Sequence, residues 1–254
     1  MGRMGRLTLD QFGDTMPVTA PAIQDSPFWY RGVDMMFIQY RTDEDAIQRI
    51  LPEGLELAED PMAVVTVADY HFSTFGPYPE TILAVPCLLD GEPVSYTHYL
   101  FTDQEAPLIA GREVWGYAKK LAHVEIINQS EIYMGIVERP KGNRILTATM
   151  RTVDNVPGDG FAAAPSVSLK MIPDAEQNGN QGQAICQLVR TEYDIAPVVA
   201  TDGLTEMWSG PGSLVYGAQS ANDPWHELPV REVMGCTFGK FNFYLPKGKI
   251  VKTY

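Results

Sequence analysis

The sequence lacks the features expected of a membrane or secreted protein. Its 254 residues contain no run of about 18 apolar residues, so no transmembrane helix is expected. Residues 1–19 lack the apolar stretch of a secretory signal peptide. Cysteine is scarce, and the three cysteines are widely spaced beside apolar residues, which favours buried free thiols over disulfides. These absences predict a cytoplasmic location and no membrane partner.

Positive charge is also in short supply. The chain has 19 lysines and arginines against 32 aspartates and glutamates, a formal net charge of −13, so a nucleic-acid partner is not expected. The four histidines show no metal-ligand spacing. No phosphate-binding glycine motif or serine-nucleophile motif occurs. The sequence therefore predicts neither a metal nor a nucleotide cofactor.

Apolar sequence, by contrast, is plentiful enough for one sizeable domain. The hydrophobic fraction is 45%, which excludes wholesale disorder. We expect an irregular N-terminal arm over residues 1–25 and a single domain over residues 26–254. Short apolar or alternating runs bounded by glycine and proline predict strands. The expected strands are 32–40, 64–72, 81–89, 96–101, 123–128, 131–137, 144–152, 166–172, 184–189, 204–208, 230–237 and 240–245.

Few helices are expected beside these strands. Thr42 and the acidic residues after it predict a capped helix that ends near residue 51, where Pro52 stops it. Residues 106–115 form at most a short helical segment. This balance predicts an α+β protein that is predominantly antiparallel β, as a curved sheet or barrel.

The most informative segment is residues 111–122, Gly-Arg-Glu-Val-Trp-Gly-Tyr-Ala-Lys-Lys-Leu-Ala. It contains the only adjacent lysine pair, Lys119 and Lys120, among apolar and small neighbours. An amine is nucleophilic at neutral pH only when its ammonium form is destabilised, by desolvation or by a neighbouring cation. Such an amine condenses with a ketone to give an imine, which is an electron sink for breaking a C–C bond. On composition alone, however, a lysine pair most often belongs to a solvated surface.

Residues 111–121 resemble the active-site segment of the acetoacetate decarboxylase superfamily, in which the first lysine forms the imine. That enzyme is itself a standard example of a lysine activated by desolvation or by a cationic neighbour. The resemblance covers about residues 25–254. Its other segments, in family order, are 40–43, 51–56, 76–80, 147–150, 169–173, 208–211, 227–230 and 245–246.

The resemblance implies a cone-like β-barrel with a few short helices, and a homo-oligomer built partly from the N-terminal arm. It assigns Lys119 as the imine-forming nucleophile and Lys120 as the adjacent cation. Glu80 is the carboxylate near the reacting carbon, and Arg112 and Glu113 support the segment, as a buried ion pair. Imine chemistry on a lysine requires no cofactor.

Two positions depart from the pattern of the decarboxylating members. Val33 stands where these members carry an arginine, and Val65 where they carry a second glutamate. Arg31 lies two residues before Val33, so a regular strand would place both on one face and let Arg31 bind the substrate carboxylate. These departures favour an aldolase-dehydratase reaction, in which a 2-oxo acid such as pyruvate condenses with an aldehyde. The alternatives are decarboxylation of acetoacetate or a related 3-oxo acid, and a non-catalytic small-molecule binder.

An aldolase requires a general acid and a general base within hydrogen-bond reach of the substrate. Glu80 is one candidate. Tyr78, Tyr117 and the C-terminal Tyr254 are candidates for the other group and for substrate binding. For each tyrosine, the more common explanation is an amphipathic residue at the edge of the core.

Overall fold

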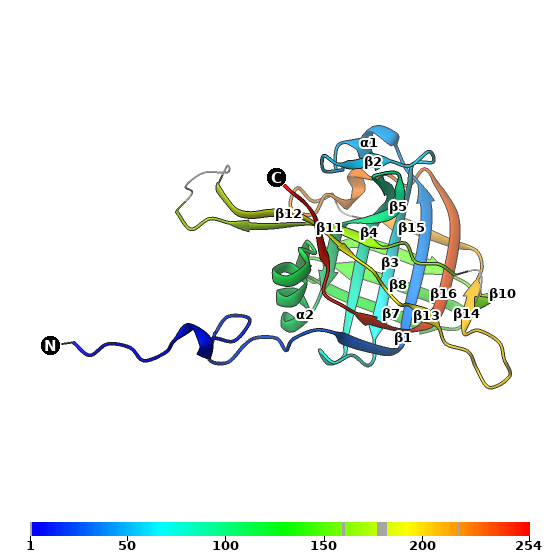
Figure 1. Cartoon of the computed structure of the whole chain (residues 1–254). Helices are drawn as coiled ribbons and strands as arrows, with labels where there is room; N and C mark the ends of the chain where they lie inside the picture. Colours follow the sequence, from blue (N-terminus) through cyan, green and yellow to red (C-terminus); the bar gives the residue numbers. More distant parts are fainter. Residues whose placement is uncertain (1, 159–160, 177–181, 218) are drawn as a thin grey trace.

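A strongly curved β-sheet forms most of the computed structural model, which describes residues 2–158, 161–176, 182–217 and 219–254 (Figure 1). The order of its strands is β10 (Asp154–Asn155), β14 (Met207–Ser209), β16 (Glu232–Leu245), β1 (Phe28–Arg41), β3 (Met62–Tyr70), β4 (Tyr78–Leu89), β5 (Glu92–Thr102), β11 (Ser166–Pro173), β12 (Gln183–Thr191) and β17 (Lys249–Thr253). Three short strands pair beside this path: β13 (Ala196–Pro197) with β16, β2 (Leu55–Leu57) with β4, and β6 (Lys119–Leu121) with β5. The pairs β5–β6 and β5–β11 are parallel, and the other described pairs are antiparallel.

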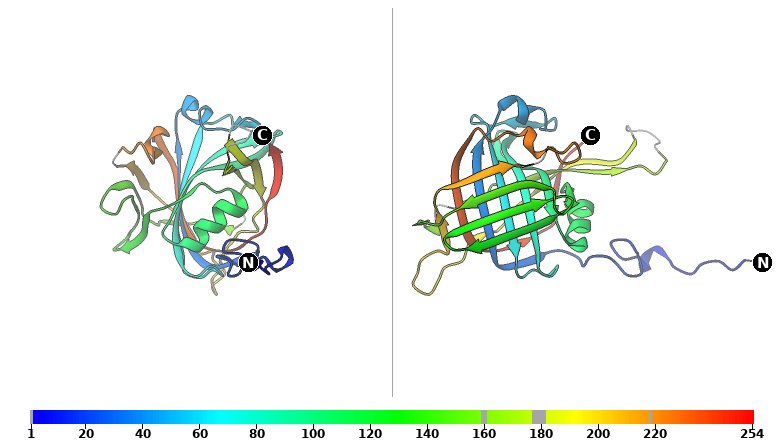
Figure 2. Two further views of the ribbon diagram at one scale, coloured as in Figure 1. Left: turned by 90° about the vertical axis from the view of Figure 1, so that its left-hand side faces the viewer. Right: turned by 180° about the vertical axis from the view of Figure 1, so that it is seen from behind.

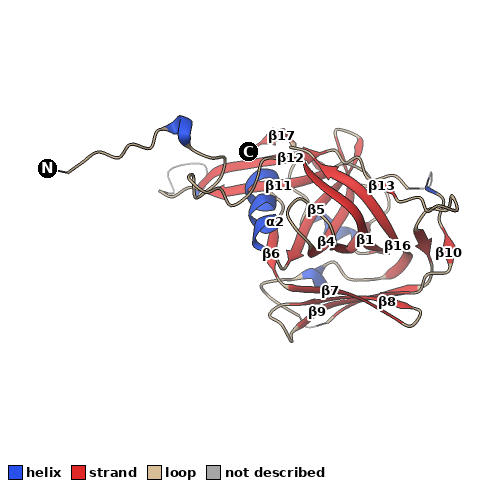
Figure 3. Cartoon of the chain, turned by 90° about the horizontal axis from the view of Figure 1, so that it is seen from below, coloured by secondary structure: helices blue, strands red, loops and turns tan. Residues whose placement is uncertain are grey.

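A second, smaller sheet covers one face of the large one (Figure 3). Its strands, in order, are β15 (Gly212–Tyr216), β9 (Arg144–Met150), β8 (Ile132–Glu138) and β7 (His123–Gln129). Successive side chains of a strand point to opposite faces. In β1, Met36 and Ile38 therefore pack toward the small sheet, whereas Met35 joins a separate apolar cluster on the other face. The large sheet thus has a dry environment on both faces.

Helices are few and short, as the sequence predicts. Within the described residues the named ones are α1 (Glu44–Gln48), α2 (Glu105–Ala110), a π-helical turn η2 (Gly111–Trp115), and 3-10 turns at Leu9–Gln11 (η1) and Trp225–Glu227 (η5). The capped helix expected to end near residue 51 is shorter than predicted, and the Asp43 side chain does not cap it. Its carboxylate instead forms a salt bridge of 2.7 Å with Arg231. No described helix is long and apolar enough to cross a membrane.

The predicted β-rich fold is confirmed, with differences in detail. The meander expected over residues 123–152 is β7, β8 and β9. The two strands expected over 230–245 are one strand, β16, because Gly239 stays in register with Met35 while lying against Met207. The strands β2, β6, β10, β13, β15 and β17 were not predicted, since they are short and lack clear alternation. The described pairings end at β10 and β17 without joining these two strands.

The chain before β1 runs away from the sheets (Figures 1 and 2). Residues 2–27 contain no strand and only the one 3-10 turn. The division into an arm and one domain stays a prediction.

Gly116 ends the π-helical turn and fixes the path of the chain into β6. Its φ of 81° lies in the left-handed region, and a Cβ there would approach the Lys170 Cα of β11 to 2.3 Å. Gly142 has a similar φ of 93° but open space around it.

Replacing these two glycines separates backbone strain from crowding. We expect Gly142→Ala to lower the free energy of unfolding by about 1–2 kcal/mol, the cost of a left-handed residue. We expect Gly116→Ala to lower it by at least about 3 kcal/mol, because steric overlap with β11 is added. Denaturant unfolding of both variants measures the difference, and equal losses would contradict the close packing of Gly116 on β11.

Candidate active site

Lys119 is delivered to the interior by the turn and strand that follow α2. The Tyr117 amide donates a hydrogen bond of 2.8 Å to the Gly111 carbonyl, closing the turn. β6 then pairs in parallel with β5, so that Lys119 lies opposite Leu100. The Lys119 side chain is only 6% exposed. Lysine is seldom buried to this degree without a reason.

The aliphatic part of the Lys119 side chain lies against Gly111. A Cβ at Gly111 would stand 2.7 Å from the Lys119 Cδ and 2.8 Å from its Cε, so only glycine leaves this path open. Arg112 donates a hydrogen bond of 3.1 Å to the Lys119 carbonyl. Arg112 is exposed and Glu113 is half-buried, so they do not form the expected buried ion pair. Arg112 supports the backbone of Lys119 instead.

Glu80 of β4 is the partner of the Lys119 ammonium. The Lys119 Nζ and the Glu80 Oε2 are in direct contact, and both side chains are 6% exposed. The Tyr70 hydroxyl donates a hydrogen bond of 3.4 Å to the other carboxylate oxygen. The Lys119 Nζ also lies 5.6 Å from the centre of the Tyr78 ring. The structure thus brings together the nucleophile and the carboxylate that the sequence assigned.

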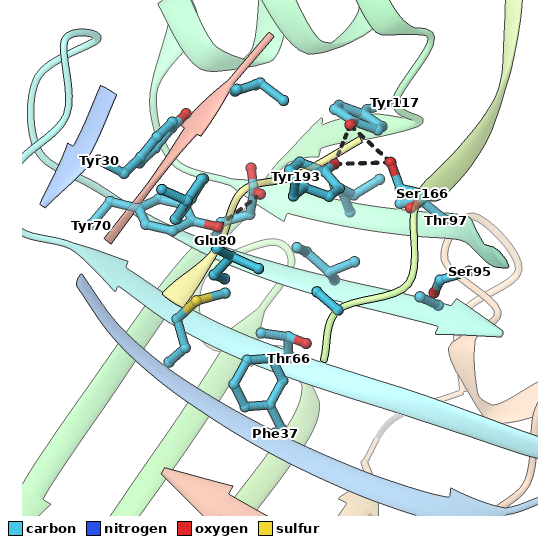
Figure 4. A pocket seen from close by; sticks show the side chains of 18 of the residues that line it. Tyr30, Phe37, Thr66, Tyr70, Glu80, Ser95, Thr97, Tyr117, Ser166 and Tyr193 are labelled. Atoms are coloured by element: carbon cyan, nitrogen blue, oxygen red, sulfur yellow. Dashed lines mark hydrogen bonds between the residues drawn. The ribbon is translucent and has the colours of Figure 1, made fainter. Parts of the chain in front are cut away.

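Lys119 and Glu80 both line a cavity of about 180 Å³. Figure 4 shows Glu80 in the wall of this cavity. Of the described residues that line it, Lys119 and Glu80 are the only charged ones. Tyrosines dominate the polar part of its wall, namely Tyr30, Tyr70, Tyr78, Tyr117 and Tyr193. Met35, Phe37, Ile82, Ile195 and Phe243 are among its apolar residues. Lys119 and Glu80 therefore lie in a cavity that is largely apolar and otherwise uncharged.

The tyrosine hydroxyls are neutral hydrogen-bond donors at physiological pH. Burial raises the pKa of Tyr70 and Tyr78 well above the usual value, and the negative charge of Glu80 raises both further. Burial likewise raises the pKa of Tyr117 and, strongly, that of Tyr193. A phenol with a raised pKa keeps its proton and can donate to a carbonyl or carboxylate oxygen.

The sequence indicated Tyr78 and Tyr117 as site residues, but it did not indicate Tyr70 and Tyr193, which also line the cavity. Tyr70 was recoverable, because it pairs with Tyr78 across the β3–β4 hairpin and so shares the face of Glu80. Tyr193 follows β12 and carries no comparable signal. The Tyr254 hydroxyl donates to the Glu53 carbonyl, and its side chain does not line the cavity.

Lys120 points away from the cavity, because neighbouring residues of a strand face opposite sides. Its Nζ lies 2.9 Å from the Asp223 Oδ1 and also contacts the Asn222 carbonyl. The buried Asp223 carboxylate binds Arg139 as well, at 3.0 Å. The charge of Lys120 is therefore neutralised on the outer face, and the structure does not support its predicted role as the cation beside Lys119.

Arg31 also lies outside the cavity, contrary to the expectation that it would share the face of Val33. The register between β1 and β16 shifts between Tyr30 and Val33, which is a β-bulge, and Gly32 has a φ of 59°. The bulge turns Arg31 outward, where it is exposed and stacks on Trp29. It also keeps Tyr30 on the cavity side.

Val65 does not line the cavity either. Its side chain packs in the core between the two sheets, and its neighbour Thr66 lines the cavity instead. The apolar character of Val65 is therefore no evidence about the polarity of the site.

Comparison with known proteins identifies the family. The family model described as acetoacetate decarboxylase (ADC) matches residues 15–254. Acetoacetate decarboxylase 1 of Bradyrhizobium diazoefficiens is 34% identical over 94% of this chain and 93% of its own length. Acetoacetate decarboxylase of Acidiphilium cryptum is 31% identical over 99% of both chains.

Solved structures show the same fold. A structure of acetoacetate decarboxylase superposes with a TM-score of 0.87 at 26% identity, over 98% of this chain and 99% of that one. The enduracididine biosynthesis enzyme MppR, solved in complex with pyruvate, has a TM-score of 0.78 at 19% identity, over 96% of this chain and 99% of that chain. At that identity the second likeness extends to the fold alone. From the family match and these relatives, the chain belongs to the acetoacetate decarboxylase family.

Proposed function

We propose that this protein is a lysine-imine lyase that decarboxylates a small 3-oxo acid such as acetoacetate. The observation that carries the proposal is the contact between Lys119 and Glu80 in a buried, otherwise uncharged cavity. The size of the cavity supports it. A cavity of about 150 Å³ accommodates benzene, a ligand of six heavy atoms. On that scale a cavity of about 180 Å³ suits the seven heavy atoms of acetoacetate.

The Lys119–Glu80 contact can start the reaction. Transfer of the ammonium proton to Glu80 leaves a free amine and a neutral acid. The amine adds to the C3 carbonyl, and one amine proton moves to the carbonyl oxygen to give a hydroxyl. The protonated Glu80 then donates its proton to this hydroxyl, so that water leaves and an iminium forms.

The iminium then acts as the electron sink. The C1–C2 bond breaks, its electron pair forms the C2–C3 double bond of an enamine, and CO2 leaves. Protonation of C2 regenerates the iminium, and addition of water releases the ketone and the amine of Lys119. Loss of CO2 removes the negative charge of the substrate carboxylate. An apolar cavity favours this loss because it solvates that charge poorly.

The same cavity is less suited to the aldolase-dehydratase reaction expected from Val33 and Val65. An aldolase must hold the substrate carboxylate through both chemical steps. Among the described residues that line the cavity, however, no cation other than Lys119 is available to bind it. Val65 also faces the other core, so one of the two departures does not affect the site. The relatives that share at least 30% identity over nearly the whole chain carry the name acetoacetate decarboxylase.

Borohydride trapping followed by intact mass tests the proposal directly. With acetoacetate, we expect CO2 release and an adduct of the mass of acetone on Lys119. An adduct that retains a pyruvate carboxylate, with no CO2 from acetoacetate, would instead support the aldolase reaction. No adduct with either compound would contradict imine chemistry and leave a non-catalytic binder.

The lysine pair provides its own matched control. We expect Lys119→Ala to abolish the trapped adduct, because the nucleophile is lost. We expect Lys120→Met to keep the adduct on Lys119, since Lys120 faces away from the cavity. Peptide mapping of the reduced protein locates the modified lysine, and an adduct on Lys120 in the wild-type protein would exchange the two roles.

Glu80→Gln tests the acid–base role with little change in side-chain volume. We expect turnover to fall by about 10²- to 10⁴-fold, the usual contribution of general acid–base catalysis. The adduct should still be trapped on Lys119 but more slowly, because Glu80 takes part in the proton transfers that form the imine. Steady-state CO2 release and a trapping time course measure the two effects. Unchanged turnover would remove Glu80 from the mechanism.

Gly111→Ala tests how precisely the lysine must be placed. The φ of Gly111 is −55°, so alanine fits the backbone, and the new Cβ overlaps only the Lys119 side chain among its nearest neighbours. We expect a fall in kcat of about 10²-fold, as for a displacement of roughly 1 Å in other enzymes, with little loss of stability. Full activity in this variant would show that the lysine takes another path.

A further inference from the structure

Three hydroxyl groups from distant parts of the chain meet in the wall of the cavity (Figure 4). The Ser166 Oγ lies 3.2 Å from the Tyr117 hydroxyl and 2.9 Å from the Tyr193 hydroxyl, and the two tyrosine hydroxyls also bond to each other. Each hydroxyl can donate one hydrogen bond and accept others. Without a ligand the three form a closed ring, which we call the hydroxyl cluster.

The position of the hydroxyl cluster suits a negatively charged group. In Figure 4 it lies on one side of Glu80, whereas Tyr30 and Tyr70 lie on the other. A substrate carboxylate is repelled by an ionised Glu80 and is stabilised where several donors converge. The raised pKa values of Tyr117 and Tyr193 keep both phenols protonated, so they remain donors.

A buried carboxylate requires such donors, because burial without hydrogen bonds is costly. Arg31, which the sequence suggested for this task, and Lys120, which it suggested as the cation beside Lys119, do not line the cavity. Arg31 stacks on Trp29 at the surface, and Lys120 is paired with Asp223. Lys119 is consumed in the imine. The uncharged hydroxyls are the groups left to bind the carboxylate.

We propose that Tyr117, Ser166 and Tyr193 bind the carboxylate of the substrate, an inference that rests on the proposed function. Upon binding, the hydroxyl hydrogens rotate from the ring to the carboxylate oxygens and hold C1 beside the iminium. Neutral donors stabilise a carboxylate less than a guanidinium would. This suits a reaction in which that charge is lost in the transition state, because tight binding of the ground state would slow it.

Removing single hydroxyls tests the proposal. We expect Tyr193→Phe and Ser166→Ala each to lower kcat/KM for acetoacetate by about 10- to 100-fold, as for the loss of a hydrogen bond to a charged group. Borohydride trapping with acetone, which has no carboxylate, should proceed at the wild-type rate in both variants. This second readout also reports that the variant is folded and that Lys119 is active.

Tyr216→Phe is the matched control. It removes a phenol that pairs with the Tyr40 hydroxyl at 2.7 Å outside the cavity, and we expect wild-type values in both assays. A wild-type kcat/KM in both cluster variants would overturn the proposal, as would an equal loss of acetone trapping. If the wild-type protein forms no imine with either compound, the proposed function itself fails. If it turns over acetoacetate but the cluster variants do so equally well, only the carboxylate site fails.

Discussion

The buried contact between Lys119 and Glu80 is the interaction on which the rest of the site depends. Two opposite charges in an apolar cavity are stable only as a pair, and loss of one partner leaves a buried charge that typically costs about 3–5 kcal/mol. The pair joins β4 to β6, two strands that are not neighbours but lie on either side of β5. Their separation is therefore fixed by the hydrogen bonds of the sheet, and the geometry of the contact is inherited from the fold.

The surrounding layers keep this pair dry. The small sheet seals one face of the large sheet, and the aromatic residues of the cavity cover the other. Water competes strongly for both an ammonium and a carboxylate, so its exclusion strengthens the direct electrostatic contact between them. The tight turn from Gly111 to Gly116 also contributes to this exclusion of water, because the Lys119 side chain packs closely against Gly111 as it enters the cavity.

The sequence was informative where the chemistry is local. The resemblance to the family predicted the fold and, with the segment around Lys119, drew attention to Lys119 and Glu80, which the structure places in direct contact. Alternation also predicted most long strands. The features that the sequence did not predict depend on the positions of β-bulges and on which strands pair. β6 is too short to show a period, so the opposite directions of Lys119 and Lys120 were not apparent. Tyr193 and Ser166 are brought together only by the pairing of β11 with β12, a long-range contact.

The bulge at Gly32 has a consequence for the electrostatics of the whole cavity. Successive side chains of a strand alternate between its two faces. One extra residue therefore moves every side chain that precedes the bulge to the opposite face. Here the extra residue places the Arg31 guanidinium in solvent and the Tyr30 phenol in the cavity wall. The Gly32 amide donates a hydrogen bond of 2.9 Å to the Asn242 side chain. Residues other than glycine disfavour the backbone conformation of Gly32. Almost any substitution at Gly32 would therefore destabilise the bulge relative to a regular strand. The net charge of the cavity thus depends on which side chains of β1 face it, and the bulge decides this as much as the amino-acid composition does.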